Sequence, residues 1–341
     1  MCGIGVVVGG APVEWVAAEC PGSPAHGFSP RFARHASVEL RRAVPEAALA
    51  SRGPDGVRRL SLSAMPRGAG SPAVAIELTA SVLGIRGAAP VLQPLVSPAT
   101  GDVLAWNGEV FGGLDEAAGG AGARTPDGGA DTLALLRALE RASSPGECLA
   151  RVRGPWALIY WRASEQALYF GRDEVGRRSL LVARTAGGLA LSSVGVPLAA
   201  LCGADDITAS PECAARGVEC AAHELCEGWE ELPPLPRGAV WRLAIDGSAR
   251  ACGAHAVVVR AVLRAKAEPP AEPHMRLVAP DALRARAPSP CAPPRAAPIA
   301  CAREASALFA AALSEAVRLR VRLIGAVSYT HLRAHETDSY L

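Results

Sequence analysis

A series of short apolar stretches, separated by turn residues, constrains the fold of this chain most strongly. Strand-like sequences occur at residues 73–85, 102–110, 156–161, 167–173, 179–184 and 188–194, and "PLPRGAVWRLAI" adds a turn and a last strand. Helical spacing occurs at residues 31–50, 131–142 and 303–324. Many strands joined by short turns, with few helices between them, predict an α+β protein rather than alternating βαβ units.

The composition changes along the 341-residue chain and predicts its domain organisation. Residues 1–245 contain the strand-rich part. Residues 246–302 are rich in Pro, Ala and Arg, with "PPAEP" and "APPRAAP", and are expected to be a linker. The last helical pattern falls in residues 303–326. Residues 327–341, "VSYTHLRAHETDSYL", differ so strongly in composition that we expect a sequence artefact and exclude them from fold reasoning.

Charge and hydropathy narrow the classes of protein that this chain could represent. The formal net charge is only +2, which does not indicate a nucleic-acid or membrane-surface binder. No apolar run approaches the roughly 20 residues of a membrane helix, and the first residues lack the features of a signal peptide. The ten cysteines are scattered, unlike the disulfide framework of a short secreted protein. We therefore expect a cytoplasmic protein; nothing in the sequence indicates its oligomeric state.

The opening sequence "MCGIGVVVGG" has two interpretations. A phosphate-binding glycine loop needs a strand before the glycines and a helix after them, whereas here a valine-rich strand follows. The second interpretation concerns Cys2, which becomes the N-terminal residue if Met1 is removed. An α-amine with a pKa of about 7.7 to 8.0 can act as a base for a thiol with a pKa of about 8.5. The alternative is a cysteine that stands at this position by chance.

Three further stretches follow Cys2 in a recognisable order: "RGPDG" at residues 52–56, "WNGEVF" at 106–111 and "GADTLALL" at 129–136. Together with "MCGI" they resemble the class II glutamine amidotransferase domain of the asparagine synthetase family. "YFGRDEVGRRSLL" at 169–181 and "LSSVG" at 191–195 are similar to the strands that close this domain in asparagine synthetases. The resemblance covers residues 1–245 and implies a four-layer αββα sandwich of the N-terminal-nucleophile hydrolase fold.

The resemblance implies a glutaminase that converts L-glutamine to glutamate and ammonia through a thioester on Cys2. Asn107 and Gly108 match the oxyanion-hole pair, since an amide and a glycine N–H are neutral donors that can lie close to a developing O⁻. Glu109 and Asp131 match acidic positions that hold the substrate's α-ammonium group. Two alternatives stay open, because Asn-Gly is also a hairpin signal and Asp131 could serve only as a helix cap.

Two departures from the family pattern concern substrate binding. The family holds the α-carboxylate with an arginine before a Gln-Pro dipeptide, and Arg86 is the arginine available in "SVLGIRGAAPVLQP". It lies nearer Gln93 than the family spacing would place it, but a guanidinium could still bind a carboxylate through a rearranged loop. Gly195 stands where synthetases usually carry an acidic residue. The alternative function is therefore a catalytically weak pseudoenzyme of the same fold that acts as a binding or regulatory module.

The ATP-binding loop of asparagine synthetases does not follow the helix at 303–326, which resembles the start of the synthetase domain. We therefore expect a truncated protein that takes part in asparagine biosynthesis. No cofactor is expected in this chain, because ATP and magnesium would belong to the missing synthetase domain. Cys213, Cys220, His223 and Cys226 could suggest zinc, but they lack paired C-x₂-C spacing. No metal site is expected.

Overall fold

The computed structural model describes residues 2–10, 13–15, 24–31, 40–65, 73–84, 89–114, 131–185, 187–202, 228–246, 258–265 and 302–321. Contacts divide the chain into a first unit, Met1–Lys266, and a second unit, Ala267–Leu341. The first unit contains all the strands described below. In the second unit the described element is the helix α5 (Ala302–Val321), which matches the helix expected from the sequence.

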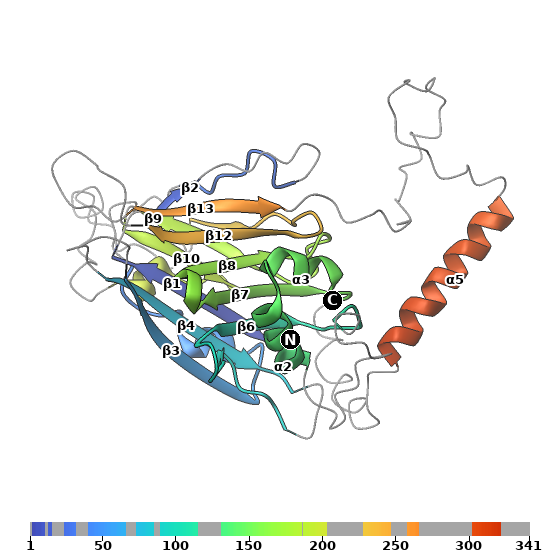
Figure 1. The fold of residues 1–341 in the computed structure, drawn as a ribbon, viewed down its shortest axis with the longest axis horizontal. Coiled ribbons are helices and arrows are strands. Elements are labelled where there is room, and N and C mark those ends of the chain that lie inside the picture. Colours follow the sequence, from blue (N-terminus) through green and yellow to red (C-terminus); the bar gives the residue numbers. More distant parts are fainter. Residues whose placement is uncertain are drawn as a thin grey trace, which may run out of the picture. The chain divides into compact units, whose positions relative to one another are not determined.

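One sheet of the first unit has six strands in the order β11-β9-β10-β1-β4-β3 (Figure 1). The strands are β1 (Gly3–Gly9), β3 (Gly56–Ala64), β4 (Val74–Val82), β9 (Leu181–Thr185), β10 (Gly188–Ser192) and β11 (Trp229–Glu231). All neighbouring strands are antiparallel. Because β1 lies between β10 and β4, the first residues of the protein are held in the interior of a sheet.

The second sheet has seven strands in the order β2-β13-β12-β8-β7-β6-β5. The strands are β2 (Val13–Trp15), β5 (Leu95–Val96), β6 (Val103–Gly108), β7 (Trp156–Arg162), β8 (Ala167–Arg172), β12 (Ala239–Asp246) and β13 (Val258–Ala265). β13 and β2 are parallel, and the other pairs are antiparallel. The expectation of an α+β protein is therefore confirmed, with two sheets that are antiparallel except for the β13–β2 pair.

The two sheets pack face to face through a core of alternating side chains. On β1, Ile4 and Val6 join the same buried cluster as Ile159 and Phe170 of the second sheet. Val7, the residue after Val6, belongs to another cluster on the opposite face of the first sheet. This alternation is what a strand with both faces covered requires, because successive side chains point to opposite faces.

Helices cover the outer face of each sheet. Leu49 of α1 (Glu46–Ala50) lies in the outer cluster of the first sheet. Leu135 of α2 (Asp131–Arg141) and Leu149 of α3 (Pro145–Arg151) pack in a cluster with Tyr160 of the second sheet. Short 3₁₀ turns occur at Ala163–Glu165 and Leu198–Leu201. The layers of the first unit are therefore helix, sheet, sheet and helix.

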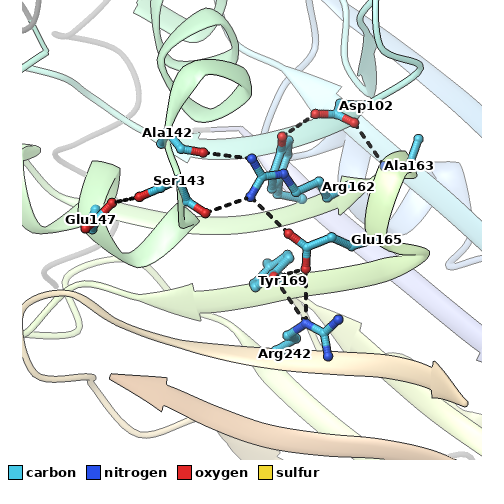
Figure 2. Close-up of polar contacts among 10 residues, drawn as sticks. Asp102, Ala142, Ser143, Glu147, Arg162, Ala163, Glu165, Tyr169 and Arg242 are labelled. Carbon is cyan, nitrogen blue, oxygen red and sulfur yellow. Dashed lines mark hydrogen bonds and ion pairs between the residues drawn. The ribbon is translucent and has the colours of Figure 1, made fainter. Parts of the chain in front are cut away.

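A polar network connects the end of α2 to the second sheet (Figure 2). Arg162 Nη2 donates to Ala142 O at 2.7 Å, and Arg162 Nη1 donates to Glu165 Oε1 at 3.0 Å. Glu165 Oε2 accepts hydrogen bonds from the Tyr169 hydroxyl at 2.6 Å and from Arg242 Nε at 3.3 Å. Burial alone would raise the pKa of Glu165, but the Tyr169 hydrogen bond and the two arginines outweigh it and lower that pKa.

Asp102 forms a second part of the same network. Its carboxylate accepts hydrogen bonds from the Tyr160 hydroxyl and, at 2.9 Å, from Ala163 N. Burial and the bond to Asp102 raise the pKa of Tyr160. Asp102 thus joins the start of β6 to the end of β7, which fixes the strand that leads into the site described below.

The structure adds a strand in residues 246–302, the stretch expected to be a linker. β13 pairs with β12 over eight positions, from Ala239↔Ala265 to Asp246↔Val258. Its sequence is rich in valine, which suits a strand. Residues 266–300 and 327–341 lie outside the described residues, so the linker, the truncated synthetase start and the artefact stay predictions. Among the described residues, no helix combines the length and apolar character needed to cross a membrane.

Candidate active site

A pocket lies between the beginning of β1 in one sheet and the end of β6 in the other. It contains about 550 Å³ of space free of protein atoms, including open solvent at its mouth. The lining residues are Cys2, Val82, Leu83, Gly84, Pro90, Val91, Gln93, Trp106, Asn107, Gly108, Glu109, Asp131, Thr132 and Arg178. The structure therefore brings five of the six predicted site residues to one pocket, although they come from distant parts of the sequence.

Cys2 is positioned by the two residues that follow it. Gly3 N donates to Ser81 Oγ at 3.0 Å, and Ile4 N donates to Ser193 Oγ at 3.1 Å. The Cys2 Sγ lies 4.0 Å from Leu83 O. Because these bonds tie β1 to β4 and to the residue after β10, they hold the start of β1, and with it the thiol, in a fixed place.

The glycines after Cys2 serve the packing of β1. A Cβ on Gly3 would lie 2.7 Å from Ser81 Oγ, and a Cβ on Gly5 would lie 2.8 Å from Val44 Cγ2. Such distances are too short for an unstrained contact, so glycine allows the segment around α1 to approach the sheet. These contacts agree with the rejection of a phosphate-binding loop.

Asn107 and Gly108 are the last two residues of β6, paired with Ala157 and Trp156 of β7. The hairpin-turn alternative for this dipeptide is therefore wrong. Asn107 is 1% exposed, and its side-chain Nδ2 has no hydrogen-bond partner among the residues that the structure describes. A buried amide without a partner costs free energy, so a ligand oxygen in the pocket could satisfy it. A Cβ on Gly108 would lie 2.6 Å from Pro155 O, which explains the need for glycine.

Gln93 holds the strand just before the Asn-Gly pair. Its Oε1 accepts a hydrogen bond from Trp106 N at 2.6 Å, and the residue is only 2% exposed. The sequence analysis used the Gln93–Pro94 dipeptide only as a landmark. Its positioning role depends on a contact across 13 residues, which no local pattern predicts.

Glu109 and Asp131 line the same pocket from different elements. Glu109 follows β6, and Glu109 N donates to Pro155 O at 3.0 Å. Asp131 begins α2, and its Oδ2 accepts a hydrogen bond from Val110 N at 2.9 Å. Asp131 thus joins the start of the helix to the chain beyond β6. The residue therefore both holds the fold through this hydrogen bond and lines the pocket.

Arg178 is a pocket residue that the sequence analysis did not single out. Its Nη2 donates to Glu109 Oε1 at 3.0 Å, and its side chain is 15% exposed. The turn before it is fixed by Asp173, whose Oδ1 accepts hydrogen bonds from Val175 N at 3.0 Å and Gly176 N at 3.1 Å. The motif "FGRDEVGRRSLL" contained this arginine, but its position in the pocket results from that turn. Arg86 lies outside the described residues.

The "RGPDG" motif supports the pocket wall. Asp55 Oδ2 accepts a hydrogen bond from Gly84 N at 2.7 Å, and a Cβ on Gly53 would lie 2.5 Å from Val82 N. Val82 and Gly84 both line the pocket. The motif therefore shapes the site through its contacts with the backbone of the pocket wall.

The charges in the pocket act on the thiol in opposite directions. Burial raises the pKa of Cys2 above its ordinary value, the charge of Asp131 raises it further, and the charge of Arg178 lowers it. Burial and then the charge of Arg178 lower the pKa of Arg52. At neutral pH the Cys2 thiol is therefore protonated and needs a base before it can act as a nucleophile.

The four residues weighed as zinc ligands, Cys213, Cys220, His223 and Cys226, lie outside the described residues. Within the part of the chain that the structure describes, no group of three or more His, Cys, Asp or Glu side chains could hold a metal ion. The expectation that this chain has no metal site stays a prediction.

Comparison with known proteins finds a similarity in the central part of the chain. Residues 83–200 match the model of the glutamine amidotransferase domain. This range includes the Asn-Gly pair, both acidic pocket residues and Arg178, whereas Cys2 precedes it.

Curated relatives share a single name. Asparagine synthetase domain-containing protein 1 of Mus musculus is 36% identical over 166 residues, which are 47% of this chain and 23% of that protein. The protein of the same name from Homo sapiens is 38% identical over 128 residues, which are 36% of this chain and 18% of that protein. This chain thus spans less than a quarter of the length of these relatives.

Two solved structures are similar over most of the chain. Glutamine phosphoribosylpyrophosphate (PRPP) amidotransferase from B. subtilis, complexed with ADP and GMP, gives a TM-score of 0.35 at 12% identity, covering 71% of this chain and 47% of that chain. A structure of the allosteric regulatory enzyme of purine biosynthesis gives 0.37 at 15% identity, covering 72% and 47%. At these TM-scores the likeness supports no functional statement. Residues 83–200 are therefore similar to a glutamine amidotransferase domain, and the chain is related in sequence to the asparagine synthetase domain-containing proteins.

Proposed function

We propose that this chain hydrolyses L-glutamine to L-glutamate and ammonia through a thioester on Cys2, in the manner of an N-terminal-nucleophile hydrolase. The observation that carries the proposal is the pocket that Cys2 shares with Asn107, whose buried Nδ2 has no partner. A thiol and a buried amide donor that line one pocket are what acyl transfer requires.

The proposed first step forms the thioester. After removal of Met1, the α-amine of Cys2 takes the thiol proton, and the sulfur attacks the amide carbon of the substrate side chain. The C=O electron pair moves to oxygen, where Asn107 Nδ2 and Gly108 N–H donate hydrogen bonds to the oxyanion. The oxyanion then collapses, the C–N bond breaks, and nitrogen leaves as ammonia with the proton that the amine returns.

The proposed second step is hydrolysis. Water adds to the thioester carbonyl, with the α-amine taking a proton from it, and the same two donors hold the second oxyanion. Collapse breaks the C–S bond, releases glutamate and restores the thiol. The need for a base follows from the raised pKa of Cys2, since an α-amine with a pKa of about 7.7 to 8.0 is available near neutral pH. Glu109 and Asp131 bind the α-ammonium group of the substrate.

The wider role that we propose is the supply of ammonia for asparagine biosynthesis. The support for this role is the name shared by the relatives, of which this chain spans less than a quarter. Glutamine hydrolysis itself needs no cofactor from this chain. ATP and magnesium would act with a synthetase domain outside it.

Glutamate and ammonia release by the purified chain tests the proposal. Intact mass should show that Met1 is removed, and L-glutamine should then yield equal amounts of both products. Cys2→Ala should abolish release while circular dichroism stays unchanged. Retained Met1 in an active preparation would exclude the α-amine as the base. Glutamine binding without any release, with Met1 removed, would support the pseudoenzyme alternative instead.

A further inference from the structure

The pocket is lined by one positively charged side chain, that of Arg178, within the described part of the chain. An α-amino acid enters with a carboxylate that loses its water, and desolvating this charge without a cationic partner is costly. The pocket therefore needs a cation, and Arg178 is positioned to supply it.

The hydrogen-bonding state of Arg178 leaves donors for a ligand. Nη2 already donates to Glu109 Oε1, but the buried Nε has no partner in the structure. A guanidinium carries five N–H donors in a planar fork that matches the two oxygens of a carboxylate. An incoming carboxylate would satisfy the unpaired Nε, and the bond to Glu109 could be kept.

The pair formed by Arg178 and Glu109 matches the charges of an amino-acid zwitterion. The two side chains place opposite charges 3.0 Å apart, and the ammonium and carboxylate of an α-amino acid are separated by a single carbon. We propose that Arg178 binds the α-carboxylate of the substrate while Glu109, with Asp131, binds its ammonium group, so that this pair selects α-amino acids. This inference rests on the proposed function and gives to Arg178 the role that the sequence suggested for Arg86.

The surroundings of Arg178 suit a fixed recognition residue. Asp173 holds the turn before it through bonds to two backbone N–H groups, and sites held by such supporting bonds are well ordered for ligands.

Arg178 has a second effect that an experiment must separate from binding, because its charge also lowers the pKa of Cys2. That effect is the same for every substrate. The ratio of kcat/KM for L-glutamine to kcat/KM for 4-aminobutanamide isolates the carboxylate contact, since 4-aminobutanamide is glutamine without its α-carboxylate. Hydrogen bonds to charged groups are worth enough to change such a ratio by roughly 10- to 10²-fold.

The ratio is measured on the full chain with Met1 removed, for the parent and for Arg178→Gln, Arg178→Lys and Arg86→Gln. Arg58→Gln removes an exposed charge on β3 and serves as the matched control. Arg178→Gln should lower the ratio by roughly 10- to 10²-fold. Arg178→Lys should give an intermediate ratio, because it keeps the charge and loses the fork. Arg86→Gln and Arg58→Gln should leave the ratio unchanged.

The inference would be overturned if Arg178→Gln lowered kcat/KM equally for both substrates. It would also be overturned if Arg86→Gln alone lowered the ratio. Either result would leave the glutaminase proposal standing. If Arg178→Gln does not fold, an unchanged ratio in Arg178→Lys overturns the inference and an intermediate one supports it. If the parent chain hydrolyses neither substrate, calorimetry on the Cys2→Ala chain measures glutamine binding instead. Glutamine binding that weakens about 10- to 10²-fold with Arg178→Gln then supports the inference alone, and no binding to the parent overturns both proposals.

Discussion

Asn107 is the second-last residue of β6, and its buried side-chain amide lines the same pocket as the Cys2 thiol, with no hydrogen-bond partner for Nδ2 among the described residues. If this amide stabilises the oxyanion, its hydrogen bond strengthens only in the transition state. Asn107→Ala should then lower kcat by about 10²- to 10³-fold, with a smaller change in KM. Steady-state kinetics measure both constants, and circular dichroism checks the fold. A variant that has lost its fold, or one that raises KM while kcat is kept, would contradict the oxyanion role.

Two charged side chains of the pocket change the pKa of the Cys2 thiol in opposite directions. Asp131 raises this pKa and Arg178 lowers it. Thiolate forms as pH rises through the thiol pKa, so the rate of alkylation of Cys2 by iodoacetamide increases with pH. The midpoint of this increase should move to lower pH in Asp131→Asn and to higher pH in Arg178→Gln. Intact mass at each pH follows the reaction, and shifts in the same direction would contradict the described electrostatics.

At the scale of elements, the end of β6 packs closely against Pro155 only because residue 108 is a glycine. A Cβ on Gly108 would meet Pro155 O at 2.6 Å, whereas one on Gly112 would meet nothing within 4 Å. Gly108→Ala should therefore destabilise the protein by about 1 to 3 kcal/mol and also disturb the Asn-Gly pair. Gly112→Ala should be nearly neutral. Urea denaturation of both variants measures the difference, and equal free energies of unfolding would show that β6 can move to accommodate the Cβ.

Several elements could be predicted from the sequence because their signals are local. The spacing of leucines indicated α2, and apolar runs bounded by turns indicated β4, β6, β7 and β8. β13 was missed because it lies directly before the Pro-rich stretches of the expected linker and is specified by its pairing with β12. Gln93 and Arg178 were not recognised as site residues for a similar reason. Each reaches the pocket through a contact between segments far apart in the sequence, which a local pattern does not contain.

At the scale of the whole molecule, β13 extends the first unit beyond the boundary expected at residue 245. The first unit ends at Lys266, and β13 pairs with both β12 and β2. A chain ended after Lys266 should keep its melting temperature and its glutamine chemistry. A chain ended after Ile245 should melt at lower temperature, because the edge of β12 loses its partner. Thermal unfolding followed by circular dichroism compares the two, and equal melting temperatures would contradict a structural role for β13.

The central claim is that Cys2 is a nucleophile facing a pocket for glutamine, and a diazoketone analogue of L-glutamine tests it most directly. With 6-diazo-5-oxo-L-norleucine, the terminal carbon takes the thiol proton, N₂ leaves, and the sulfur bonds to that carbon. Intact mass and peptide mapping of the full chain with Met1 removed should show one equivalent of label on Cys2. L-Glutamine should slow the labelling, and Cys2→Ala should prevent it. Label on Cys148 in place of Cys2, or no protection by glutamine, would contradict the account.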